Sequence, residues 1–415
     1  MNLTRRMFLS SSGALAACML APRASAWSAA RPRVAEGKTL VLIFLRGGAD
    51  GLNLVAPYAS DTYHRLRGWM AVPPPGRDNG ALDLDGSFGL NPAAAPLLPF
   101  FQEGSGLAVH AVGHARNSRS HFAEQDVWET AVVDNSVDAD GWLNRHLQTS
   151  DGHGPIRAVA LGGSLPRVLR GRASALALRG LSELSTGGGG DEAMWKALAR
   201  VGGGQGTAGE ASSLLERSSN ETLDAIRTLR EALAAMPPSS VKYPNTDLGR
   251  RMRDAAKLIR MNVGVEIIEL DLDGWDTHRG QGADQGPYAN LVKTLSRSLG
   301  AFLNDLQDRR DDVLVLVHSE FGRTAAINGT AGTDHGWGNC ALAFGGPVLA
   351  AGRGQPRMLL GRWPGLERDE LQDERDLRHT TDFRDLFAEA VQQHLGNHRL
   401  GEIFPGHEPE RVGVV

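Results

Sequence analysis

Short runs of apolar residues, separated by segments of helical character, constrain this chain more than any other feature of its sequence. Residues 38–45 (KTLVLIFL) form a continuous apolar run that ends at Gly47-Gly48, the pattern of a strand buried on both faces of a parallel sheet. Parallel strands need long crossover connections, which are usually helical. Further runs follow at residues 107–112, 156–161, 265–272, 313–317 and 341–344.

Segments in which apolar residues recur at helical spacing lie between these runs. They cover residues 122–133, 222–236, 248–263, 288–309 and 382–395. Strands that alternate with helices predict an α/β fold with a doubly wound, mainly parallel sheet and helices on both faces. A glycine-rich stretch interrupts the alternation, and we expect a small helical cap insertion around residues 181–245.

The N-terminus is predicted to be an export signal rather than part of the fold. Thr4-Arg5-Arg6-Met7-Phe8-Leu9 is a twin-arginine pattern, a short apolar run follows it, and Ala24-Ser25-Ala26 is a cleavage site. That run is shorter than the roughly 20 residues that cross a bilayer, so we expect no transmembrane span in the mature chain. We predict export through the twin-arginine translocase to the periplasm or beyond, with cleavage after residue 26 and a single α/β domain over residues 27–415. Leu15-Ala16-Ala17-Cys18 also has the pattern of a lipobox, so a lipid anchor at Cys18 is the alternative.

The composition excludes several classes of protein. The chain has 44 Lys and Arg against 48 Asp and Glu, a balance too even for a nucleic-acid binder that neutralises phosphates. Its 41% hydrophobic content is too high for a disordered chain, and two cysteines cannot build a disulfide scaffold.

Candidate functional residues follow the predicted strands, at the edge where open α/β sheets bind their ligands. Asp50 follows the first run, where its carboxylate suits a metal or a base, although an Asp-Gly turn is the structural alternative. Ser120 follows the second run and precedes a helix, so it is either an activated nucleophile or an ordinary N-cap. Arg116 and His121 beside it are predicted to be catalytic as well, because they suit an electropositive pocket for an oxyanion.

Acids and imidazoles also follow the later strands. Asp276 and His278 have a spacing that puts both on one side of an extended segment, as in half of a metal site. Glu320 follows the fifth run, and Asp334-His335 is flanked by glycines in a further loop. Buried carboxylates need cations or protons, so convergence of these residues on one sheet edge predicts a functional site.

Several segments together resemble the domain of unknown function family 1501. Besides the export signal they are LRGGADGLN (45–53), SRSHFAEQD (118–126), DGWDTH (273–278), SEFGRT (319–324), GTDHGWGN (332–339) and TTDFRDL (380–386). This family is placed in the alkaline phosphatase and sulfatase-like superfamily. The resemblance implies an alkaline-phosphatase-like fold, one or two divalent metal ions (zinc, calcium or manganese) and hydrolysis of a small anionic phosphate or sulfate ester.

The resemblance also implies roles for particular residues. Asp50 would be the metal carboxylate after the first strand, and Ser120 the nucleophile. Asp276 and His278 would be the Asp–His pair of one metal, although the superfamily often spaces this pair more widely.

Two alignments remain open for the other metal ligands. In the first, Glu320 replaces an aspartate at the strand end and His335 is a late metal histidine. Phe321 then stands where the superfamily has an imidazole, which weakens a second metal site. In the second alignment, Asp334-His335 is the strand-end pair.

Two functions from different classes are therefore compatible with the sequence. The first is an exported metal-dependent hydrolase, and the second is a non-catalytic binding or assembly protein with a reduced site. An oxidoreductase is disfavoured because the chain lacks an iron–sulfur cysteine set and a dinucleotide fingerprint. Near the C-terminus, Asp382 is predicted to cap a helix and His379 to be a loop residue.

Overall fold

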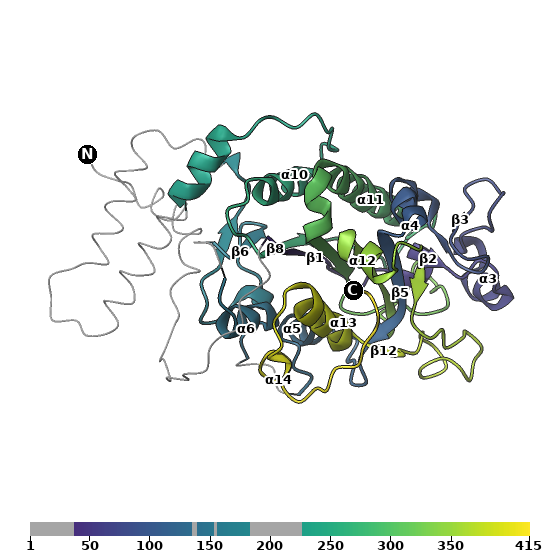
Figure 1. The fold of residues 1–415 in the computed structure, drawn as a ribbon. Helices are drawn as coiled ribbons and strands as arrows, with labels where there is room; N and C mark the ends of the chain where they lie inside the picture. Colours follow the sequence, from purple (N-terminus) through teal and green to yellow (C-terminus); the bar gives the residue numbers. More distant parts are fainter. Residues whose placement is uncertain (1–36, 135–138, 153–155, 183–225) are drawn as a thin grey trace, which may run out of the picture.

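A mixed sheet forms the centre of the computed structural model, which describes residues 37–134, 139–152, 156–182 and 226–415 (Figure 1). The strand order within these residues is β11-β5-β10-β9-β1-β8-β6-β7, and β12 also pairs with β5. The strands are β1 (Thr39–Leu45), β5 (Gly106–Gly113), β6 (Ala158–Leu161), β7 (Leu176–Leu178), β8 (Ile267–Leu272), β9 (Val313–His318), β10 (Asn339–Phe344), β11 (Leu359–Leu360) and β12 (Thr381–Asp382).

The predicted first strand lies inside the sheet. All seven residues of β1 are buried, and β1 pairs in parallel with β8 on one side and β9 on the other. β6 in turn pairs in parallel with both β8 and β7. Side chains on both faces of β1 pack under the two helix layers, which explains why this run is apolar at successive positions.

β10 runs opposite to the other long strands. It pairs antiparallel with both β9 and β5, so β5 points the same way as β9. The segment between β9 and β10 contains no helix, whereas a parallel return would need a crossover of a dozen or more residues, usually helical. The sheet is therefore mainly parallel, as predicted, with one reversed strand inside it.

Helices cover both faces of the sheet, as a doubly wound fold requires (Figure 1). One face carries α5 (His121–Thr130), α6 (Trp142–Thr149), α13 (Phe383–Glu389), the π-helical turn η6 (Ala390–His394) and α14 (Leu400–Ile403). The opposite face carries η3 (Pro92–Leu97), α4 (Leu98–Glu103), α10 (Asp247–Arg260) and α11 (Pro287–Asp305). Successive side chains of a strand point to opposite faces, so Val41 and Ile43 of β1 pack under one helix layer and Leu40 and Leu42 under the other.

Shorter elements complete the described part. A small sheet has the order β2-β4-β3, formed by Val55–Ala56, Gly89–Leu90 and Leu82–Asp83. The remaining helical turns are α2 (Gly51–Leu54), α3 (Asp61–Arg67), η2 (Gly68–Met70), η4 (Arg167–Leu169), η5 (Gln307–Asp312) and α12 (Gly346–Ala351).

Two sequence predictions fall largely beyond the described residues. The export signal lies wholly outside them, and so do residues 183–225 of the expected cap insertion. Residues 226–235, at the end of that insertion, are helical. None of the helices in the described part combines the length and the apolar character that a membrane span needs.

A neutral histidine is buried under α5. His318 ends β9 with 2% of its surface exposed, and its ring lies 5.2 Å from that of Trp128 and 4.5 Å from that of Phe44. Neither ring nitrogen has a hydrogen-bond partner among the described residues. Burial lowers the pKa of His318 to about 3, so the ring stays uncharged in the native protein.

This burial predicts a loss of stability in acid. The unfolded chain takes up a proton at His318 below pH 6.5, the ordinary value, whereas the native ring resists it down to about pH 3. The stability contribution is thus intact above pH 6.5 and falls by up to about 1.4 kcal/mol per pH unit below it. His318→Leu should have a shallower slope in urea unfolding measured between neutral pH and about pH 4. His398→Leu, at an exposed position, should keep the wild-type slope; equal slopes in all three proteins would contradict the prediction.

Candidate metal centre

Loops that are distant in sequence meet at one edge of the sheet. β1, β5, β8 and β9 share one direction, so the residues after them lie at the same edge. Because β10 is reversed, the residues before it, including His335, reach that edge too. The sheet direction therefore explains how segments between residues 46 and 338 form one site.

Four of the predicted site residues lie together there. Ligand-type atoms of His121, Asp276 and His335 are all within 4.8 Å of one another, the only such group of three or more in the described part of the chain. The Asp276 Oδ1 atom lies 3.4 Å from His121 Nε2 and 3.2 Å from His335 Nε2. The fourth residue is His278, whose Nε2 lies 3.0 Å from Asp276 Oδ1 and 2.9 Å from His335 Nε2.

The hydrogen bonds of the three rings fix which nitrogen carries the proton. Each Nδ1 faces an oxygen of the protein, so it is the protonated nitrogen and Nε2 presents its lone pair to the cluster. The partners are Glu320 Oε1 for His121 at 2.8 Å, Asp334 Oδ1 for His278 at 2.9 Å, and the Arg119 carbonyl for His335 at 2.8 Å.

Lone pairs that face one another repel unless a cation or a proton lies between them. The Nε2 atoms of His278 and His335 are 2.9 Å apart, and Nε2 of His121 is buried without a hydrogen-bond partner. Three imidazole nitrogens and one carboxylate oxygen are a donor set that zinc and similar divalent metals prefer. The residues present therefore fit a divalent cation.

The charges around the cluster agree with this set. Burial would raise the pKa of Asp276, but the Arg323 guanidinium, at 2.8 Å, lowers it to about 2. Burial lowers the pKa of His335, which favours the neutral ring that metals bind. The hydrogen bond that His121 donates to Glu320 raises the pKa of His121, so a metal and a proton would compete for this ring.

Glu320 lies behind His121 rather than in the cluster. Its side chain is fully buried, and its two oxygens accept hydrogen bonds from Gly47 N, Gly48 N, His121 Nδ1, Gln125 Nε2 and Ser319 Oγ at 2.8–3.1 Å. Burial would raise the pKa of Glu320, but these bonds lower it to about 2. Glu320 was predicted to be a metal ligand; in the structure its carboxylate lies behind the His121 ring and accepts the hydrogen bond from its Nδ1.

Asp334 has a similar place behind His278. Its Oδ1 accepts from His278 Nδ1 at 2.9 Å and from Asn328 Nδ2 at 3.0 Å. Carboxylates that accept the Nδ1 proton of a metal-binding histidine fix the orientation of the ring and increase its basicity. Of the residues in the two alignments left open by the sequence, His335 lies in the cluster, whereas Glu320 and Asp334 lie behind His121 and His278.

Asp50 is engaged elsewhere. Its carboxylate is 1% exposed and forms a bidentate ion pair with Arg67, whose side chain is fully buried. Gln281 Nε2 donates to the same carboxylate at 2.6 Å. These contacts satisfy the carboxylate without a metal, so the structure does not bring Asp50 into the cluster as predicted.

The segment before α5 carries two more of the predicted site residues, Ser120 and Arg116. Ser120 is the N-cap residue of α5, but its side chain makes no capping hydrogen bond, so the hydroxyl is not used as the structural alternative required. Arg116 is 67% exposed and pairs with Asp134. Within this segment, the arginine that contacts the cluster is Arg119, which adopts a left-handed backbone (φ 57°) and directs its carbonyl to His335.

Phe321 has a packing role. The residue is fully buried, and its ring centroid lies 4.9 Å from those of both His121 and His335. His121, from the helix after β5, supplies an imidazole on the side where Phe321 offers none. Sequence reasoning expected His121 to be catalytic and did not consider it as a ligand.

Comparison with known proteins identifies the family. The model of the DUF1501 family, described as proteins of unknown function, matches residues 109–402. The chain belongs to this family. A search of curated proteins found no match.

Several solved structures are similar to this DUF1501 protein at low identity. The C-terminal periplasmic domain of EcEptC from Escherichia coli, in complex with Zn, has a TM-score of 0.40 at 9% identity, covering 93% of this chain and 90% of that one. The PsFucS1 sulfatase from Pseudoalteromonas sp. has a TM-score of 0.36 at 10% identity, covering 90% and 70%. The phosphonate monoester hydrolase of Agrobacterium radiobacter has a TM-score of 0.31 at 11% identity, covering 90% and 78%.

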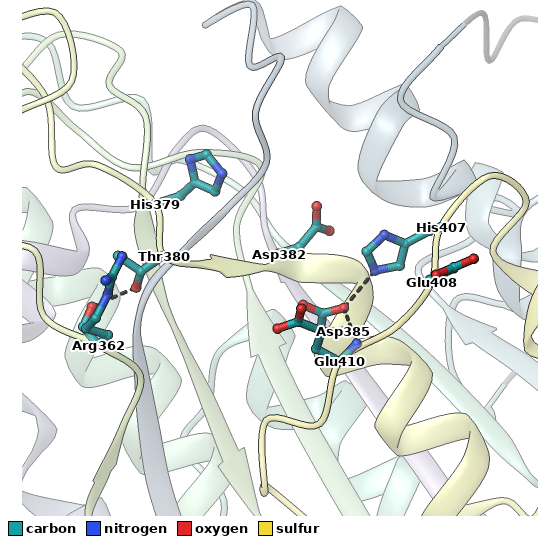
Figure 2. A pocket seen from close by; sticks show the side chains of 8 residues that line it. All are labelled: Arg362, His379, Thr380, Asp382, Asp385, His407, Glu408 and Glu410. Atoms are coloured by element: carbon teal, nitrogen blue, oxygen red, sulfur yellow. Dashed lines mark hydrogen bonds and ion pairs between the residues drawn. The ribbon is translucent and has the colours of Figure 1, made fainter.

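A separate pocket of about 380 Å³ lies between β12 and the C-terminal segment of the DUF1501 protein. Figure 2 shows its lining, in which His407 bonds to Asp385 at 2.7 Å. His379 is on its wall and accepts a hydrogen bond from Trp337 at 3.2 Å. Asp382 also lines it and caps α13 as predicted, accepting from Arg384 N. Neither residue belongs to the metal cluster.

The contacts of Asp50 predict a structural role that an isosteric variant can isolate. Asp50→Asn should lower the free energy of unfolding by roughly 3–5 kcal/mol, because it leaves Arg67 buried without a counter-charge. The folded fraction should keep the metal content of the wild type. Asp276→Asn should lose the metal. It should lower the free energy of unfolding by less than Asp50→Asn, because Asp276 is 46% exposed and its buried partner Arg323 keeps four backbone carbonyl acceptors. Urea unfolding and elemental analysis test both; a folded Asp50→Asn protein without metal would make Asp50 a ligand after all.

Proposed function

We propose that this DUF1501 protein is an exported metal-dependent hydrolase of phosphate or sulfate esters. The observation that carries the proposal is the convergence of three unprotonated imidazole nitrogens and one carboxylate oxygen at the functional edge of the sheet. The proposed ligands are His121, Asp276, His278 and His335.

One ion, with zinc first among the candidates, suits this donor set best. Calcium takes six to eight oxygen ligands and manganese favours carboxylate and water, whereas imidazole suits zinc. The cluster is a single group, and Asp50 is satisfied by Arg67, so the proposal is a mononuclear centre rather than a pair of metals.

The protein would contribute positioning and charge to the reaction. A bound divalent cation supplies Lewis-acid polarisation of an ester oxygen and activation of a bound nucleophile. Ser120 stands next to the ligand His121 with its hydroxyl uncapped, which suits attack on the phosphorus or sulfur atom of the substrate. The backbone N–H groups in the first turn of α5 favour an oxyanion at this position.

The cellular location follows from the sequence. We propose that residues 1–26 direct the folded chain through the twin-arginine translocase to the periplasm or the extracellular space, with lipidation at Cys18 as the alternative. A transport route for folded proteins suits a centre whose proposed ligands come from three separate segments, because its metal could be loaded before export.

The metal centre predicts a defined stoichiometry. Purified protein should contain about one equivalent of zinc, because the four ligands form a single cluster. His335→Ala should lose the metal and keep the fold. His379→Ala, which changes a histidine of the other pocket, is the matched control and should retain it. A folded wild-type protein that binds no metal would refute the hydrolase proposal and favour a non-catalytic binding protein.

The nucleophile predicts a second, separable effect. On an aryl phosphate or an aryl sulfate, Ser120→Ala should lower kcat by at least about 100-fold, because the covalent step is removed. Its metal content should match the wild type. Ser87→Ala, at an exposed position in the turn between β3 and β4, should retain full turnover. Full turnover by Ser120→Ala would exclude Ser120 as the nucleophile and leave a metal-activated water in that role.

A further inference from the structure

The turn Arg46-Gly47-Gly48, directly after β1, contacts the metal cluster from two sides without supplying a ligand. One side, the His121 arm, is Glu320 with His121, and the other, the Asp276 arm, is Arg323 with Asp276. We infer that this turn sets the geometry of the centre, and that Gln125 and Arg46 are positioning residues for the ligand His121. The inference rests on the metal site proposed above and adds to it residues that hold the ligands in place.

The amide groups of the two glycines hold the His121 arm. Gly47 N donates to Glu320 Oε1 at 2.9 Å and Gly48 N donates to Glu320 Oε2 at 3.1 Å. Glu320 Oε1 accepts the Nδ1 proton of His121 at 2.8 Å. The two successive amides therefore fix the carboxylate that fixes the ring.

The carbonyl groups of the same two glycines hold the Asp276 arm. Arg323 Nε donates to Gly48 O at 2.5 Å, and its Nη2 donates to Gly47 O. The same Nη2 donates to Asp276 Oδ1 at 2.8 Å. The Arg323 side chain is fully buried, so its conformation is fixed by its surroundings. Its guanidinium bonds to both the turn and the Asp276 carboxylate, so the position of the turn fixes that of the carboxylate.

Steric contacts explain why the turn has glycine at both positions. Gly47 and Gly48 have φ angles of +116° and +67°, which other residues adopt only with strain. A Cβ on Gly47 would lie 2.6 Å from the backbone nitrogen of Asp276, and one on Gly48 would lie 2.4 Å from the Phe321 ring. The turn thus packs directly on a ligand residue and on the ring that supports two others.

The Arg46 side chain completes the arrangement through α5. Gln125 is one turn after His121 on that helix, so both side chains face the turn. Arg46 Nη1 donates to Gln125 Oε1 at 3.2 Å, which leaves the Gln125 amide nitrogen to donate to Glu320 Oε1 at 3.0 Å. Arg46 is itself held by Glu129 at 3.2 Å and Asp271 at 2.6 Å.

This chain of contacts gives Gln125 one orientation. An amide can turn its oxygen and nitrogen around, and a reversed Gln125 would place oxygen against the Glu320 carboxylate. Arg46, which can only donate, excludes the reversed state. Removing either side chain should therefore loosen Glu320 and, through it, the ring of His121.

The test is the affinity and spectrum of the metal centre in the full-length mature protein. Gln125→Met keeps the length of the side chain and removes its donor. We expect its dissociation constant for zinc to rise by about 10-fold, within the range for partners outside the ligand set, and the absorption spectrum of the cobalt-loaded protein to shift. Asp126→Asn is the matched control, because Asp126 is the next residue of α5 and pairs with Arg167 at the surface. Thermal unfolding of the metal-free proteins monitors the fold.

A second variant covers the case in which Gln125→Met does not fold. Arg46→Lys keeps the positive charge beside Glu129 and Asp271 but loses the planar fork that bonds to Gln125 as well, so zinc affinity should again fall. If the wild type and a folded variant bind zinc equally and have the same cobalt spectrum, the positioning role is refuted while the proposed function stands. If the wild type binds neither metal, both are refuted.

Discussion

His121, His278 and His335 each donate a hydrogen bond from Nδ1 to an oxygen atom of the protein. The rest of the site depends on this choice of the protonated nitrogen. It directs three Nε2 lone pairs at the Asp276 carboxylate, an arrangement that repels itself without a cation or a proton at its centre. The oxygen atoms come from a buried carboxylate, an exposed carboxylate and a backbone carbonyl. Glu320 is the costliest of them to bury, and its five hydrogen-bond donors are what make its burial possible.

The reversed strand β10 makes the convergence possible. A chain with only parallel strands presents the ends of its strands at the functional edge and hides their beginnings. Here the segment before β10 reaches the same edge, so His335 meets His278 from a loop that a purely parallel sheet would place elsewhere. The sequence prediction of a mainly parallel sheet did not include this reversal, although no segment of helical spacing was found between these two strands.

The fold was more predictable than the role of each residue at the site. Apolar runs locate the long strands because burial on both faces leaves few polar positions in them, and the strand-end rule then selects Asp276 and His278. His335 was a candidate because of its glycine-flanked Asp-His pair, and it reaches the same edge because β10 is reversed. Spacing does not separate a ligand from the carboxylate behind it, so Glu320 looked like a ligand. Asp50 was misleading for another reason, because its partner Arg67 belongs to a helix that no periodic pattern predicted. Arg119, unlike Arg116, is half-buried and has a left-handed backbone that directs its carbonyl to His335, which a sequence pattern does not report.

The number of carboxylates among the proposed ligands decides the charge of the centre. Phe321 offers no ligand atom directly after β9, and the His121 ring from α5 lies in the cluster beside it. Three neutral imidazoles and the single Asp276 carboxylate leave a divalent cation with a net charge of about +1. Arg323, paired with that carboxylate, adds further positive charge beside it. Such a centre attracts an anionic ester, whereas a cluster that included Asp50, Glu320 and Asp334 as ligands would repel one. The two carboxylates behind His121 and His278 thus orient their rings from outside the ligand set, and the positive charge of the centre is greater than if they were ligands themselves.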